Sequence, residues 1–113
     1  MTVKAMAPSM REKKRYIAFE AAAEKPLPRD AVVREIRESM NSLIGTLGMA
    51  KAGLIFLPDW ENNKGVLRIS HKYTDIAKSA IALVKQINGT NVIIKSITIS
   101  GILKKSRNKI GGR

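Results

Sequence analysis

The feature that most limits the fold is a stripe of apolar residues between two chain breakers, Pro28 and Gly48. Its apolar positions recur every three or four residues, which is the spacing of one face of an amphipathic helix. Asp30 stands where an N-cap is expected, and Gly48 is a typical stop. The stripe consists of Val32, Val33, Ile36, Met40, Leu43, Ile44 and Leu47. We therefore predict one long helix here.

A second helix with one apolar face is expected between residues 72 and 89. Thr74 or Lys72 opens it, and Asn88-Gly89 closes it as a left-handed cap. Its apolar face consists of Ile76, Ala77, Ala80, Ile81, Val84 and Ile87.

Segments rich in β-branched and aromatic residues alternate with these helices and predict strands. Two prolines, Pro26 and Pro28, separate the first strand from the first helix, and Pro58 ends the second strand before a hairpin loop over residues 58–65. The predicted strands are residues 15–23, 51–57, 66–71 and 92–100. The order β-α-β-β-α-β is that of a ferredoxin-like α+β sandwich, a four-stranded antiparallel sheet with two helices on one face.

The length of 113 residues, 44% of them hydrophobic, fits one domain with a packed core. We expect that domain to span residues 15–110. Residues 1–14 would be a basic N-terminal extension, and residues 111–113 a flexible tail. Ile102 and Leu103 would anchor a short C-terminal helical extension.

The sheet face away from the helices is also expected to be apolar. In residues 54–57 and 92–94 the apolar side chains stand on consecutive positions, whereas a half-solvated antiparallel strand alternates. We expect the C-terminal tail, an N-terminal segment or another subunit to cover this face.

Positive charge is concentrated at the two ends of the chain. Lys and Arg number 21 against 9 Asp and Glu, a formal net charge of +12. Residues 1–15 hold five bases and one acid, residues 101–113 five bases and no acid, and the 85 residues between them 11 bases and 8 acids. Such an excess indicates a polyanionic partner, either nucleic acid or an acidic membrane surface.

Several other classes of protein are disfavoured. The chain has no cysteine, which removes disulfides and thiolate metal sites, and it has no signal peptide or apolar run near the roughly 18 residues of a membrane span. We therefore expect a cytoplasmic protein. His71 is the single histidine, and the acids Glu20, Asp59, Glu61 and Asp75 fall on different elements without the spacing of metal ligands. We expect no catalytic residue, bound metal or cofactor in this chain.

Residues 64–69 (KGVLRI) invite comparison with the RNA-recognition motif, whose third strand begins with a basic residue and glycine. That motif continues with aromatic residues that stack on bases, whereas Val66, Leu67 and Ile69 stand here. Contacts to the phosphates of a folded RNA are therefore favoured over base stacking. Trp60 is interpreted as folding back onto the core, with a partner anchor as the alternative.

Five segments together resemble one family. They are residues 15–20 (RYIAFE), 64–69 (KGVLRI), 71–75 (HKYTD), 80–83 (AIAL) and 100–105 (SGILKK). In this order and spacing they are similar to the archaeal ribonuclease P protein component 2 family, a Pop-type subunit family, over residues 15–109.

The resemblance implies a ferredoxin-like core and a subunit of the ribonucleoprotein that removes the 5′ leader from precursor tRNA. It implies that the RNA and its magnesium ions do the chemistry. The protein would support the catalytic RNA together with another protein subunit, and it would also self-associate.

On this interpretation eight bases are the candidate RNA-binding residues. They are Lys14, Arg15, Arg68, Lys72, Lys104, Lys105, Arg107 and Lys109. One alternative is a free-standing RNA-binding module or ribosome-associated protein. Another is a small enzyme such as an acylphosphatase, which would need an arginine in a glycine-rich loop where residues 26–28 (PLP) stand.

Overall fold

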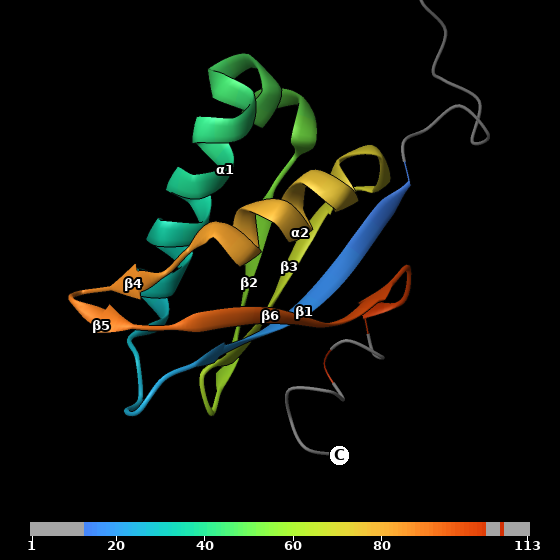
Figure 1. The fold of residues 1–113 in the computed structure, drawn as a ribbon. Coiled ribbons are helices and arrows are strands. Elements are labelled where there is room, and N and C mark those ends of the chain that lie inside the picture. The colour runs from blue at the N-terminus through green and yellow to red at the C-terminus, as the bar shows by residue number, and fades with distance from the viewer. Residues whose placement is uncertain (1–12, 104–106, 108–113) are drawn as a thin grey trace, which may run out of the picture.

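The computed structural model describes residues 13–103 and residue 107. Its elements are β1 (Lys14–Ala22), α1 (Arg29–Ala52), β2 (Ile55–Glu61), β3 (Lys64–Ser70), the 3-10 turn η2 (His71–Tyr73), α2 (Thr74–Leu83), β4 (Gln86–Ile87), β5 (Thr90–Asn91) and β6 (Ile93–Ser100). Four strands form an antiparallel sheet in the order β2-β3-β1-β6, and α1 and α2 lie on one of its faces (Figure 1). The predicted ferredoxin-like fold is confirmed. Most of the predicted N-terminal extension and the predicted tail over residues 111–113 lie outside the described residues.

The core lies between this sheet and its two helices. Ile17 and Phe19 of the central strand β1 are fully buried, as are Ile36 and Met40 of α1 and Ile81 of α2. Burial of such a side chain contributes about 1.5–3 kcal/mol. The first part of the stripe predicted from the sequence, with Val32, Ile36 and Met40, therefore supplies the inner face of α1. Its last part does not, because Leu43 is 45% exposed and Leu47 is 70% exposed.

Helix α1 begins one residue after Pro28, so the prediction of Asp30 as its N-cap is wrong. Proline has a fixed φ and no N–H to leave unsatisfied, which suits the entry to a helix. The carbonyl of Pro28 accepts a hydrogen bond from the Val32 N–H at 3.3 Å. Asp30 lies in the first turn, where its carboxylate is still favoured by the helix dipole.

The predicted end of α1 at Gly48 is also wrong, because the helix continues to Ala52 through a kink at Gly45. Gly45 has φ 70° and ψ 178°, a conformation that is essentially restricted to glycine. Gly48 packs against the Ile44 side chain so closely that an added Cβ would lie 2.6 Å from Ile44 Cβ. Gly53, with φ 64°, ends the helix in the left-handed conformation.

The hairpin between β2 and β3 is tighter than predicted. Strand β2 runs through Pro58, and its turn is the pair Asn62-Asn63, with φ values of 53° and 60°. Two positive φ values match the twist of a two-residue hairpin. Pro58 is tolerated because β2 is an edge strand whose pairing is interrupted between Phe56 and Trp60.

Asn88-Gly89 closes a small hairpin and not α2, which corrects another prediction. The helix ends at Leu83, and Asn88 and Gly89, with φ 51° and 79°, form the turn between β4 and β5. Asn-Gly is a strong signal for such a turn. The Val92 N–H then donates to the Lys85 carbonyl at 2.9 Å, so β6 begins one residue later than predicted.

The second face of the sheet, away from the helices, carries a small apolar cluster. Ala18 of β1 and Val66 of β3 are buried there, with Tyr16, Leu57 and Leu103 packed against them. Leu103 belongs to the C-terminal segment, so this part of the tail covers the middle of the face. Leu103 and Arg107 are both helical, as expected of the short extension.

Apolar side chains remain open on both sides of this cluster. Ile55 of β2 is 43% exposed and Ile93 of β6 is 62% exposed. Ile55 pairs with Arg68 and Ile93 with Ala22, which places both isoleucines on the second face. None of the helices in the described part of the chain is long and apolar enough to cross a bilayer.

Candidate nucleic-acid interface

Basic residues from separate parts of the sequence meet at one end of the sheet. Strand β1 starts beside the end of β3, where Lys14 pairs with Ser70, and the His71 N–H donates to the Lys13 carbonyl at 2.8 Å. This register brings the first residues of β1 next to η2, which carries Lys72. We call the surface formed by Lys13, Lys14, Arg15, Arg68 and Lys72 the basic end.

Arg15 extends the basic end toward the last strand. Its Nη1 donates to the Lys14 carbonyl at 3.0 Å, and a Cβ added to Gly101 would lie 3.5 Å from the same Nη1. Tyr16 pairs with Ser100, so the C-terminal segment leaves the sheet at this end. The guanidinium therefore stands where that segment begins.

Lys14 and Arg68 lie on the second face. Arg68 pairs with Tyr16 on one side and Ile55 on the other, and Lys14 pairs with Ser70. Both cations are half-buried. Arg68 Nε is buried without a hydrogen-bond partner. An unpaired, partly desolvated guanidinium is costly, so an anion from outside would stabilise it.

Four of the eight predicted residues are thus brought together: Lys14, Arg15, Arg68 and Lys72. Arg107 is placed differently, because its Nε and Nη2 bind Asp59 at 2.8 Å and 3.2 Å. Lys104, Lys105 and Lys109 lie outside the described residues.

Two basic residues near this end were missed by sequence reasoning. Lys13 precedes β1 and is exposed. Its neighbour Lys14 is among the predicted residues, and this adjacency is the signal that could have identified Lys13. Lys51 lies in the last turn of α1, two residues before Gly53. The sequence pattern places Lys51 in a strand, because it predicts the end of the helix at Gly48. A base in a last helical turn is the expected complement of the helix dipole.

The opposite end of the sheet, next to the β2–β3 turn, has mixed charge. Glu61, Lys64, Glu20 and Lys95 stand opposite one another across β2, β3, β1 and β6, which gives a row of alternating sign. Opposite charges in such cross-strand positions are mutually stabilising. We call this the hairpin-tip end.

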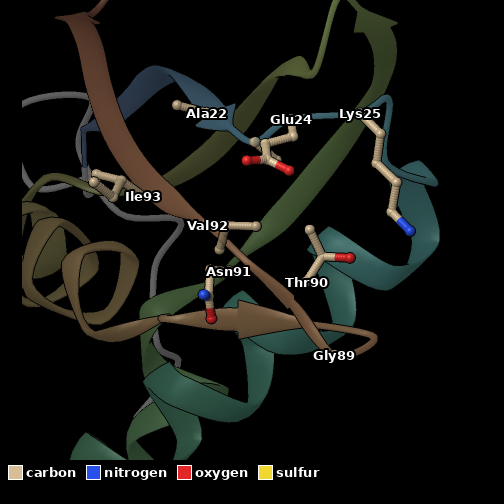
Figure 2. A pocket seen from close by; sticks show the side chains of 9 residues that line it. Ala22, Glu24, Lys25, Gly89, Thr90, Asn91, Val92 and Ile93 are labelled. Carbon is tan, nitrogen blue, oxygen red and sulfur yellow. The ribbon is translucent and has the colours of Figure 1, made fainter.

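A hollow of about 660 Å³ lies at the hairpin-tip end, between the end of β1 and the β4–β5 hairpin. Figure 2 shows Glu24 and Lys25 on one side of it and Thr90 and Asn91 on the other. His71 is exposed, and among residues 13–103 and 107 no group of three or more His, Asp or Glu side chains gathers as a metal site would.

Fold and surface together define a ferredoxin-like α+β domain with a cationic surface at one end of its sheet. The chain belongs to the Rpp14/Pop5 family, whose model matches residues 15–111. The resemblance found in the sequence is therefore confirmed.

Similar proteins cover almost the whole chain. Ribonuclease P protein component 2 of Thermococcus gammatolerans is 36% identical over 107 residues, covering 94% of this chain and 89% of that protein. The protein of the same name from Methanosarcina mazei is 33% identical, covering 95% and 91% respectively. A chain in the cryo-EM structure of yeast ribonuclease MRP has a similar fold, with a TM-score of 0.54, 13% identity and coverage of 91% of this chain and 89% of that chain.

Proposed function

We propose that this protein is a subunit of ribonuclease P, the ribonucleoprotein that cleaves the 5′ leader from precursor tRNA, in the cytoplasm. Its relatives carry the name of that enzyme's protein component 2. The basic end would contact phosphates of the catalytic RNA. The observation that carries this role is the convergence of Lys14, Arg15, Arg68 and Lys72, none of which forms an ion pair with another described residue.

The protein would act by lowering the electrostatic cost of folding the RNA. A folded RNA packs its phosphates closely, and cations placed along its backbone replace condensed counterions. Arginine binds phosphate in a bidentate manner, whereas lysine acts as a point charge. We assign the hydrolysis, and the magnesium ions it needs, to the RNA. The pure protein with magnesium and precursor tRNA should release no 5′ leader, and specific cleavage without added RNA would contradict this assignment.

A second protein subunit of the same enzyme, or a second copy of this chain, would cover the apolar positions that stay open. Ile55 and Ile93 flank the part of the second face that Leu103 covers. Light scattering of the pure protein over micromolar concentrations should show self-association. A monodisperse monomer that also binds no other ribonuclease P subunit would contradict this part of the proposal.

The identity of the RNA is tested by purifying the tagged full chain from its native cells and sequencing the RNA that accompanies it. Ribonuclease P RNA should be enriched over ribosomal RNA. Enrichment of ribosomal RNA alone would favour the alternative of a ribosome-associated protein.

The role of the basic end is tested with two variants that lose equal charge. One changes Lys14, Arg15, Arg68 and Lys72 to Gln, and the other changes Lys25, Lys64, Lys85 and Lys95, which are far from the basic end. Each phosphate contact contributes a slope of roughly −0.7 to −0.9 in log affinity against log salt concentration. The first variant loses four contacts and should flatten the slope for the catalytic RNA by about 3 units, and the control by less than about one. Equal salt slopes for the two variants would show that the basic end is not the RNA interface.

A further inference from the structure

Three polar side chains without partners converge on the second face at the basic end. Arg68 Nε and the Ser70 hydroxyl are buried without a hydrogen-bond partner, and Ser70 is 0% exposed. The Lys14 amine makes no hydrogen bond or ion pair with another described residue. Buried polar groups are nearly always satisfied, so this arrangement requires an explanation.

The register of the sheet shows how the three groups are placed. Lys14 stands directly opposite Ser70, and Arg68 precedes Ser70 by two residues on the same strand, so all three side chains belong to one face. A Cβ added to Gly53 would lie 3.3 Å from Lys14 Nζ. Gly53 precedes by two residues Ile55, the partner of Arg68. The Lys14 side chain therefore crosses over Ser70 and ends beside Gly53.

Two of these three groups can only donate, since lysine and arginine side chains have no acceptor atoms. The Ser70 hydroxyl can donate and accept, but it has no hydrogen-bond partner among the described residues. What satisfies such a group is an anion with several oxygens. The methylene stem of Lys14 covers Ser70, and because that stem is flexible it can move aside at little cost.

We propose that Lys14, Arg68 and Ser70 form a seat for one phosphodiester of the RNA backbone, with the Ser70 hydroxyl as its floor. The inference rests on the proposed function and gives it a specific contact. A phosphate fits better than a carboxylate of a protein partner because Lys13, Arg15 and Lys72 lie at the same end of the sheet as the seat, where their positive charge suits a chain of phosphates.

The position of the seat also determines how RNA lies on the sheet. Leu103 packs on Ala18 and Val66, one step along the strands from Tyr16 and Arg68. The middle of the second face is thus occupied by the chain itself. The RNA backbone would pass along the edge of the covered area, and its bases would not stack on the sheet.

The first test is a titration of the ¹⁵N-labelled full chain with inorganic phosphate, matched by sodium chloride at equal ionic strength. The Nε–H signal of Arg68 should shift in a saturable way with phosphate and stay in place with chloride. Arg107 provides an internal control, because its Nε is already bound to Asp59 at 2.8 Å. Equal shifts of both arginines, or no shift of Arg68, would overturn the seat.

The second test uses Ser70→Ala with Ser100→Ala as the control, since the Ser100 hydroxyl already accepts the Ile102 N–H at 2.9 Å. A hydrogen bond to a charged group lost from the seat should weaken binding of the catalytic RNA on the order of tenfold. The melting temperature of Ser70→Ala should stay equal or rise, because no internal bond is lost. Ser100→Ala should keep its RNA affinity. A lower melting temperature of Ser70→Ala with unchanged affinity would assign the hydroxyl to the fold and overturn the proposal.

Arg68→Lys keeps the charge and removes Nε, so it should weaken RNA binding by a similar factor with an almost unchanged salt slope. If the wild-type chain fails to bind the catalytic RNA, the proposed function fails. If the wild type binds and both Ser70→Ala and Arg68→Lys bind equally well, only the seat fails. If the two variants lose binding to a partner protein but keep their binding to RNA, the seat receives a carboxylate of that protein.

Discussion

The two ends of the sheet differ in whether their polar groups have partners within the chain. At the hairpin-tip end, Asn63 accepts a hydrogen bond from the Leu27 N–H at 2.8 Å and donates one to the Lys25 carbonyl at 3.1 Å. The charges of that end alternate across all four strands. At the basic end, Arg68 Nε and the Ser70 hydroxyl are buried and unpaired. The hairpin-tip end is therefore completed by the chain itself, whereas two buried polar groups of the basic end have no partner among the described residues.

Because of this difference, we expect the hairpin-tip end to contribute to stability and the basic end to RNA binding. Substitutions at the hairpin-tip end should change the free energy of unfolding and leave RNA binding alone. Substitutions at the basic end should do the reverse. A residue that breaks this rule would show that the two ends are not distinct.

The largest loss of stability is expected for Gly65→Ala at the hairpin-tip end. Gly65 pairs with Trp60, and an added Cβ would lie 2.9 Å from Trp60 Cε3 and 3.0 Å from Phe19 Cζ. Such overpacking costs about 1–3 kcal/mol. Urea unfolding should show that loss, while the salt slope of RNA binding stays the same. An unchanged free energy of unfolding would mean that the two rings move apart easily.

A smaller loss is expected for Asn63→Ala, with Asn62→Ala as a matched control. Both residues have positive φ, so both substitutions strain the turn to a similar degree. The side chain of Asn63 alone joins the turn to the β1–α1 connection. Asn63→Ala should therefore be less stable than Asn62→Ala by about 1–2 kcal/mol. Equal stabilities would show that these hydrogen bonds contribute nothing net.

At the basic end, Lys72→Gln should change binding more than stability. Lys72 is exposed, and substitutions at such positions usually alter stability by within about 0.5 kcal/mol. Loss of one phosphate contact should flatten the salt slope by roughly 0.7–0.9. Lys78→Gln, an exposed lysine further along α2, is the control. Equal slopes for both variants would restrict the interface to the strands.

Much of the fold could be predicted because it depends on local pattern. The stripe from Val32 to Met40 identified the inner face of α1, and the order of elements identified the sheet. One of the errors fell at a turn signal that has two uses. The pair Asn88-Gly89 suits both a helix cap and a hairpin turn. Which of the two forms depends on whether the Val92 N–H can donate to the Lys85 carbonyl, as it does here.

The site was less predictable, since it depends on contacts between distant residues. Basic residues were recognised by type, but only the register between β1 and β3 places Lys14 beside Ser70. Nothing local marks Ser70 as unpaired. The pairing of Arg107 with Asp59 joins positions 48 residues apart, so nothing in the local sequence separates Arg107 from the other C-terminal bases.

The smallest effects are expected for substitutions of Arg107 and Asp59, because Asp59 of β2 already neutralises the Arg107 guanidinium. They test whether the C-terminal segment behaves like the basic end or like the hairpin-tip end. The Arg107 side chain is 47% exposed and that of Asp59 24%, and an exposed pair contributes about 0.2–1 kcal/mol to stability. Asp59→Asn should therefore lower the free energy of unfolding only slightly. It also frees the guanidinium, so the salt slope of RNA binding should steepen by at most one contact, roughly 0.7–0.9. Arg107→Ala should leave the slope unchanged if Asp59 holds the guanidinium in the complex as well. A flatter slope for Arg107→Ala would instead show that RNA takes Arg107 from Asp59, and the C-terminal segment would then belong with the basic end.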